Sequence, residues 1–215
     1  MRPLVFAALT LNPKRLLRSG GLALLTAIVF AESGLLIGFF LPGDSLLFIA
    51  GFFASDSGGN VLPALPYVLI CAFLAAVAGD QVGYLFGRKV GPSLFARPDS
   101  RYFKQEHLQK AHAFMDRHGP KTVVLARFVP IVRTFAPIVA GVGDMEYRTF
   151  VTYNVIGGLL WAVGVTTLGY FLGQVDFIEK NIEVGIVAIV LVSLIPMVFE
   201  LLRHRRRARS AAVAD

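Results

Sequence analysis

Five ionisable side chains lie inside stretches of the chain that are otherwise apolar. They are Glu32, Asp44, Asp80, Arg127 and Arg133. An ionised group alone in hydrocarbon costs at least about 2.5–3.5 kcal/mol, so each of these groups must find an opposite charge, water or a charged ligand. The three acids precede the two arginines along the chain. This order predicts that carboxylates from the first half meet guanidinium groups from the second half.

Arg127 and Arg133 flank Pro130, and Pro137 follows them. A guanidinium group stays charged and offers a planar fork of donors that fits phosphate or carboxylate. A helix broken at these prolines would also present free backbone N–H groups. The pattern predicts an anion site in which both arginines bind phosphate. In the alternative reading, the two arginines only pair with acids and hold the fold together.

The carboxyls of Glu32 and Asp44 are candidates for proton coupling and for charge pairing with these arginines. A buried carboxyl next to an arginine can take up and release a proton as its surroundings change. The alternatives are a permanent salt bridge for Glu32 and a helix cap for Asp44, which follows the helix-breaking pair Pro42-Gly43. Asp80 and Arg88 are supporting candidates whose role is more structural.

The sequence lacks the motifs that several other classes of protein chemistry require. There is no Walker loop, no HExxH motif and only one cysteine, Cys71. No nucleophile and base accompany the intramembrane acids. We therefore expect no catalytic activity, no cofactor and no metal site. The net charge of +7 could indicate nucleic-acid binding, but the basic residues collect between the apolar runs, which is typical of loops at a membrane surface.

The elements that must position these residues are membrane helices. The chain of 215 residues is 55% hydrophobic and only 16% charged, with a mean hydropathy of +0.65. Apolar runs predict four crossings, at residues 22–41, 62–87, 149–173 and 184–202. Two further elements, one after Pro42 and one over 127–143, are predicted to be re-entrant. In an alternative arrangement, residues 22–54 form one hairpin.

The distribution of basic residues predicts the orientation. Lysines and arginines are frequent in residues 1–19, in the loop 88–121 and in the tail 203–215, whereas the connection 55–60 has none. The positive-inside rule therefore places both termini and the central loop in the cytoplasm, with 55–60 outside.

Three short motifs occur twice in the same order. Phe40-Leu41-Pro42 matches Phe128-Val129-Pro130, Ala50-Gly51 matches Ala140-Gly141, and GYLFG at 83–87 matches GYFLG at 169–173. The spacing from proline to Gly-Tyr differs by only two residues between the copies. This predicts an inverted repeat with halves at about 22–91 and 110–175, an architecture common in secondary transporters. The repeat lies within a membrane domain at 20–183, followed by a C-terminal transmembrane helix at 184–202.

The longer motifs resemble a known family. ESGLLIGFFLPGDSLLFIAGFFA (32–54), GDQVGYLFGRKVG (79–91), the segment 118–150 and NVIGGLLWA (154–162) are similar to the DedA family of bacterial inner-membrane proteins, also called SNARE-associated or VTT-domain proteins. The resemblance implies that Glu32, Asp44, Arg127 and Arg133 are functionally essential. It also implies that the protein helps to maintain the cell envelope in a way that depends on the proton motive force, and that it transports undecaprenyl phosphate.

The sequence thus predicts an all-α polytopic membrane protein that acts as a lipid flippase. Its predicted partners are membrane lipids, above all a polyprenyl phosphate, and protons, without nucleic acid. Two alternatives stay open, namely a proton-coupled ion or small-solute transporter and a non-transporting membrane scaffold. The oligomeric state is also open, and a homodimer is one option.

Overall fold

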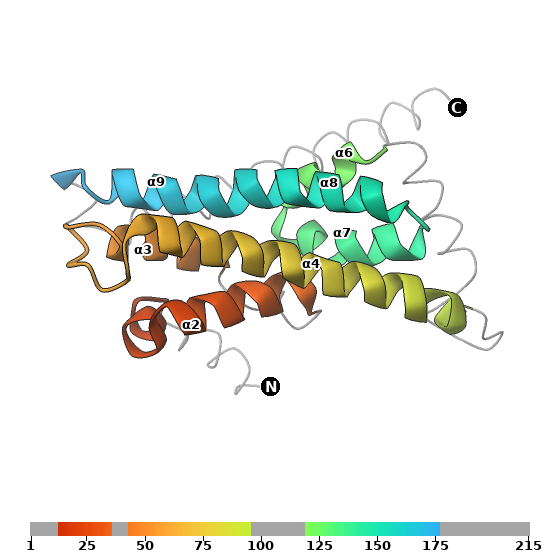
Figure 1. Ribbon diagram of the computed structural model, residues 1–215, viewed down its shortest axis with the longest axis horizontal. Helices are drawn as coiled ribbons and strands as arrows, with labels where there is room; N and C mark the ends of the chain where they lie inside the picture. Colours follow the sequence, from red (N-terminus) through yellow and green to blue (C-terminus); the bar gives the residue numbers. More distant parts are fainter. Residues whose placement is uncertain (1–12, 36–42, 96–118, 177–215) are drawn as a thin grey trace, which may run out of the picture.

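The computed structural model describes residues 13–35, 43–95 and 119–176. Over these residues every regular element is a helix, which confirms the expected all-α class for this part of the chain (Figure 1). The helices in chain order are α2 (Pro13–Gly34), α3 (Gly43–Phe53), α4 (Leu65–Phe95), α6 (Lys121–Ala126), α7 (Pro130–Val142), α8 (Tyr147–Gly158), the π-helix η2 (Leu159–Val163) and α9 (Gly164–Leu172).

Two helical segments are long and apolar enough to cross a membrane. They are Leu65–Gly91, with 27 residues, and Tyr147–Leu172, with 26 residues. At a rise of 1.5 Å per residue each is about 40 Å long, which exceeds the roughly 30 Å of bilayer hydrocarbon. These segments correspond to the predicted crossings at 62–87 and 149–173. The predicted crossing at 184–202 lies outside the described residues.

The described part of the first apolar run forms a shorter helix than the crossing predicted over 22–41, of which residues 36–41 lie outside the described residues. Helix α2 ends at Gly34, and its apolar part is the short segment Gly20–Gly34. That segment is about 20 Å long, too short to cross the hydrocarbon. The helix also bends at Gly21, whose φ of 54° lies in the left-handed region that favours glycine. Pro42, the predicted breaking residue, lies outside the described part of the chain.

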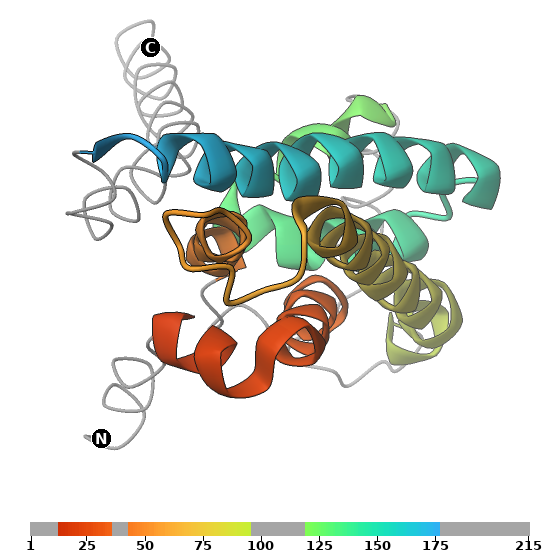
Figure 2. The ribbon, with the colours of Figure 1, turned by 60° about the vertical axis from the view of Figure 1, so that its left-hand side comes forward.

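Helices α2 and α3 instead form the hairpin that the sequence left as an alternative. Helix α2 runs parallel to α4. Two pairs of contacts in the same chain order show this: Leu22 of α2 lines a groove with Cys71 of α4, and further along Gly34 lies against Gly79. Helix α3 then returns toward the start of α2. The centroid of the Phe53 ring, at the end of α3, lies 5.7 Å from the guanidinium carbon of Arg18. Figure 2 shows α3 between α2 and α9.

This hairpin corrects the expected topology. The positive-inside rule placed the segment before residue 20 and the connection 55–60 on opposite sides of the membrane, yet Arg18 and Phe53 are neighbours. The predicted topology failed because it treated every apolar run of sufficient length as one straight crossing of the membrane. The remaining terminal residues on which the predicted cytoplasmic orientation rests, 1–12 and 203–215, lie outside the described residues.

The second predicted re-entrant element is a shorter hairpin. Helix α6 ends at Ala126, three residues intervene, and α7 begins at Pro130, so the predicted break at this proline is confirmed. Pro137, in contrast, does not break the helix, which continues to Val142. Its ring packs toward Gly83 of α4, and a helix supported by a neighbour tolerates the one lost N–H bond.

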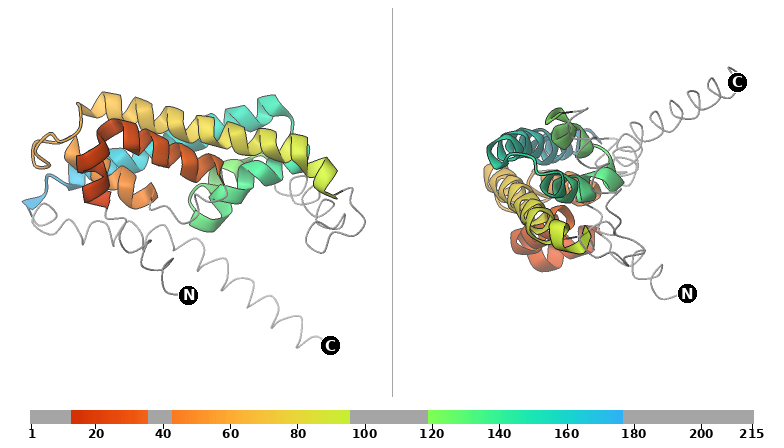
Figure 3. Two further views of the ribbon diagram at one scale, coloured as in Figure 1. Left: turned by 90° about the horizontal axis from the view of Figure 1, so that it is seen from below. Right: turned by 90° about the vertical axis from the view of Figure 1, so that its right-hand side faces the viewer.

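The two hairpins are packed reciprocally against the two long helical segments. Helix α3 packs on α9, and α7 packs on α4, with α3 and α7 toward opposite ends of the bundle (Figures 1 and 3). Close approaches occur at matched motif residues. A Cβ on Gly51 would strike the backbone of Thr166 and Tyr170, and one on Gly141 would strike the backbone of Tyr84 and Arg88. This arrangement supports the inverted repeat, which stays a prediction.

Candidate functional site

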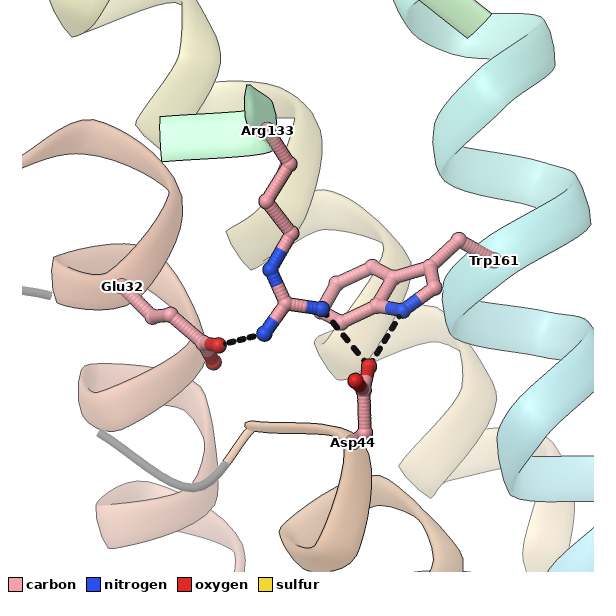
Figure 4. A network of polar contacts seen from close by, with 4 residues as sticks. All are labelled: Glu32, Asp44, Arg133 and Trp161. Carbon is pink, nitrogen blue, oxygen red and sulfur yellow. Dashed lines mark hydrogen bonds and ion pairs between the residues drawn. The ribbon is translucent and has the colours of Figure 1, made fainter. Parts of the chain in front are cut away.

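Arg133 of α7 is the centre of a buried polar network (Figure 4). Its Nη1 donates a hydrogen bond to Asp44 Oδ1 at 2.6 Å, and its Nη2 donates to Glu32 Oε1. The indole Nε1 of Trp161 donates to the same Asp44 Oδ1 at 2.7 Å. The guanidinium carbon of Arg133 also lies 4.7 Å from the centroid of the Trp161 ring, within the range of a cation–π contact.

Each member of this network comes from a different helix. Glu32 lies in the last turn of α2, and Asp44 lies in the first turn of α3. A carboxylate in a first turn is favoured by the helix dipole, but the Asp44 side chain bonds to Arg133 and Trp161. Asp44 therefore forms contacts across the bundle, beyond any role as a helix cap.

The network is almost fully withdrawn from the surface and its charges do not balance. Glu32 is 2% exposed, Asp44 8%, and the Arg133 side chain 10%. With all groups ionised, one guanidinium and two carboxylates carry a net charge of 1 − 2 = −1. One proton on either carboxyl brings the net charge to zero. Arg133 Nε is buried and has no hydrogen-bond partner among the described residues.

Arg127 lies in a second network, and the described contacts join it to none of the partners of Arg133. It donates from Nη2 to Asp80 of α4 and to Asn154 Oδ1 of α8. Asn154 in turn donates to the carbonyl of Val77 at 3.1 Å. The stem of Arg127 lies against Gly157, where a Cβ would come within 2.8 Å of its Cδ. Here one cation faces one anion, so the charges balance, and Arg127 Nε has no hydrogen-bond partner within the described part of the chain.

The structure therefore brings together some of the predicted residues and separates others. Glu32, Asp44 and Arg133 meet, with Gly43 against the Glu32 carboxylate. Arg127 meets Asp80 instead. Arg88 is half-exposed, donates to the hydroxyl of Tyr84 and lies 3.9 Å from Asp144, so it belongs to neither network. Among the described residues no group of three or more His, Cys, Asp or Glu side chains could hold a metal ion.

Two members of these networks were missed from the sequence. Trp161 is not among the predicted site residues, yet it is 2% exposed and donates to Asp44. Asn154 is not among them either. A signal existed for both. Tryptophan in membrane helices is enriched at the interfaces, whereas Trp161 lies near the middle of Tyr147–Leu172. An amide within that apolar segment likewise indicates a buried partner.

The described residues contain helices of membrane-spanning length and two buried charge networks, one of them held between half-length hairpins. These features define a helical membrane protein. Comparison with known proteins agrees. The family model described as the VTT domain matches residues 41–171. No solved structure matches the chain.

Three relatives illustrate the match. The chain is 49% identical over 190 residues to Protein DedA of Escherichia coli (strain K12), covering 88% of this chain and 86% of that protein. It is 45% identical over 188 residues to an uncharacterized membrane protein of Mycobacterium tuberculosis (strain ATCC 25618 / H37Rv), covering 87% and 82%. It is 32% identical over 177 residues to Inner membrane protein YqjA of Escherichia coli (strain K12), covering 82% and 79%. The chain belongs to the DedA family of VTT-domain membrane proteins.

Proposed function

We propose that this chain is a lipid translocase that moves a lipid phosphate, such as undecaprenyl phosphate, across the bacterial plasma membrane and so supports the cell envelope. The observation that carries the proposal is the buried guanidinium of Arg133, held by two carboxylates from another hairpin. A guanidinium fork that binds carboxylates also fits the oxygens of a phosphate. On this proposal the chain transports its lipid and performs no covalent chemistry.

The resting network supplies the counter-charges that the cargo replaces. Glu32 and Asp44 neutralise Arg133 when no lipid phosphate is bound, which avoids the cost of an unpaired buried charge. An incoming phosphate competes with both carboxylates for the same two nitrogen atoms. Arg133 Nε, buried and without a partner among the described residues, offers a further donor to the ligand.

Charge counting links transport to protons. A phosphate that binds Arg133 adds negative charge to a network that already has an excess of one negative charge. Protonation of Glu32 and Asp44 offsets this addition, and their deprotonation on the other side of the membrane expels the phosphate. A proton gradient would therefore drive net movement of the lipid. Arg127, predicted to share phosphate binding, is engaged by Asp80, so its contact with the lipid stays a prediction.

The half-length hairpins suit a lipid cargo. Only the headgroup needs a polar path, because the hydrocarbon chain of the lipid stays in the bilayer. Two hairpins that enter from opposite ends and meet at Arg133 shorten the barrier between the two membrane surfaces. We propose that they are the two copies of an inverted repeat.

The test is a flipping assay in proteoliposomes. Purified protein is reconstituted with a fluorescent polyprenyl phosphate, with a phospholipid control, and with or without a pH gradient. Arg133→Ala and Glu32→Gln are measured beside the wild type at equal incorporation. We expect wild-type protein to move the polyprenyl phosphate faster under the gradient. Arg133→Ala should move none, and Glu32→Gln should lose the response to the gradient.

Other outcomes point to the other candidate functions. Movement of neither lipid under any gradient would overturn the translocase proposal. Proton flux with a small solute, combined with activity in Arg133→Lys, would favour an ion or solute transporter. Full function in cells for charge-neutral variants of Glu32 and Arg133 would favour a scaffold. Measurable release of phosphate from the lipid would identify an enzyme.

A further inference from the structure

One oxygen atom in the Arg133 network accepts two hydrogen bonds from different helices. Asp44 Oδ1 lies 2.6 Å from Arg133 Nη1 of α7 and 2.7 Å from Trp161 Nε1 of η2. Figure 4 shows both donors directed at this atom. One of the donors is cationic and the other is neutral. Together they define a position that fits an anionic oxygen.

The indole is held in place independently of Asp44. Trp161 is 2% exposed and packs in the same apolar cluster as Leu46, Leu47 and Val68. Its ring also lies against the guanidinium of Arg133. It sits in the π-helix η2, a type of element often found at functional sites. When Asp44 withdraws from this position, the indole N–H therefore remains directed at it.

An indole N–H is a donor only, and a buried donor without an acceptor is costly. Departure of Asp44 thus creates a demand for another acceptor at the same position. A carbonyl or hydroxyl group would satisfy Trp161, but once Glu32 has also left Nη2 it would leave the charge of Arg133 without a counter-ion. An oxyanion satisfies both, with one oxygen at the Asp44 position and a second oxygen at Nη2, where Glu32 is bound now.

We propose that Trp161 is a binding residue for the phosphate group, and that the Asp44 carboxylate occupies the phosphate oxygen position when no ligand is bound. This inference rests on the proposed function, because it concerns the ligand of the same site. The chemistry that it specifies is a phosphate monoester or inorganic phosphate. Trp161 selects for an oxygen acceptor, and Arg133 selects for negative charge.

The chain contains a single tryptophan, so its tryptophan fluorescence, excited where tyrosine does not absorb, reports on this site alone. Purified full-length protein in detergent is titrated with farnesyl phosphate, with inorganic phosphate, with farnesol and with chloride at matched ionic strength. We expect farnesyl phosphate to change the emission saturably and farnesol and chloride to leave it unchanged. A response to inorganic phosphate at the same concentration would identify free phosphate as the ligand, and its absence would identify the lipid headgroup.

Two replacements separate the N–H group from the ring. Trp161→Phe removes the N–H and part of the ring. Incorporation of benzothienylalanine, in which sulfur replaces the N–H, keeps the bicyclic ring and therefore its packing on Arg133. For both, we expect the dissociation constant for radiolabelled farnesyl phosphate to rise about 10- to 100-fold, the range for loss of a hydrogen bond to a charged group. Flipping should fall at low lipid and recover at saturating lipid.

The control is Leu160→Phe, a change at a half-exposed neighbour in the same π-helix, which should leave binding unchanged. Wild-type affinity in the benzothienylalanine protein would overturn the role of Trp161 while leaving the translocase proposal intact. A wild-type protein that binds farnesyl phosphate through Trp161 but flips no lipid would support the site and overturn the translocase. Absence of any phosphate binding by the wild type would overturn the inference.

Discussion

Arg127 and Arg133 lie six positions apart in one short hairpin, yet they have different surroundings. Arg127 faces a single acid, Asp80, and the neutral amide of Asn154, so its charges balance. Arg133 faces two acids, Glu32 and Asp44, and leaves an excess negative charge. Both guanidinium groups are buried, so burial alone does not separate the two networks.

The difference shows how one hairpin can combine a fixed connection with an exchangeable one. The balanced network ties α4, α6 and α8 together, and it extends to the Val77 carbonyl. Nothing in its charge count favours the gain or loss of a proton or an anion. The unbalanced network becomes neutral when it takes up one proton. We therefore assign the first to stability and the second to transport.

The largest expected effect comes from breaking the balanced network. Arg127→Met leaves the buried carboxylate of Asp80 without a cation, which should lower the free energy of unfolding by about 3–5 kcal/mol. The double variant Arg127→Met/Asp80→Leu removes both charges and should recover most of that loss. Denaturation in detergent, followed by circular dichroism, measures both variants.

Transport by the double variant then tests the assignment of Arg127. None of the hydrogen bonds of the Arg133 network is removed in this variant, so we expect flipping to return together with folding. A protein that folds well but transports nothing would instead show that Arg127 contacts the lipid phosphate, as the sequence predicts.

A smaller effect is expected from a methyl group added beside each network. In Gly43→Ala the new Cβ would strike the carboxylate of Glu32, and in Gly157→Ala it would lie 2.8 Å from Cδ of Arg127. Each change should cost about 1–3 kcal/mol, as overpacking usually does, and lower the melting temperature by several degrees. Per folded molecule, Gly43→Ala should transport poorly and Gly157→Ala normally. Equal transport by the two would remove the distinction between the networks.

The smallest effect is expected at Arg88. Its side chain is 49% exposed and its pairing with Asp144 is at 3.9 Å, so Arg88→Ala should change stability by no more than about 1 kcal/mol. Flipping should stay at the wild-type rate, which makes this variant the arginine control for the other measurements. A clear loss of transport would extend the functional site to this end of α4.

Much of the charge pairing could be predicted from the sequence. Ionised groups in apolar runs must pair, and the order of acids before bases indicated contacts between the halves, as Arg133 with Glu32 and Asp44 shows. Which acid each arginine selects could not be predicted. That choice depends on helix packing, which places Asp80 beside Arg127 through close contacts at Gly157 and Gly158.

The fold was predicted less completely. The long segments and the break at Pro130 follow from apolar length and proline chemistry. The early end of α2 could not be predicted, because residues 22–41 are long and apolar enough for a crossing. Only the return of α3 toward the start of α2 shows that the run is a hairpin. Pro137 was overinterpreted for a similar reason, since packing on α4 stabilises a helix that local preferences disfavour.

The separation of the charges along the chain has a consequence for biogenesis. Glu32 and Asp44 leave the ribosome 101 and 89 residues ahead of Arg133, and Asp80 precedes Arg127 by 47. A nascent first half therefore holds three acids and none of the arginines that later neutralise them. Its hairpin cannot reach its final place until the second half has been inserted. We therefore expect the first hairpin to complete its folding only after the second half has been inserted, and a truncated first half should be a substrate for quality-control proteases.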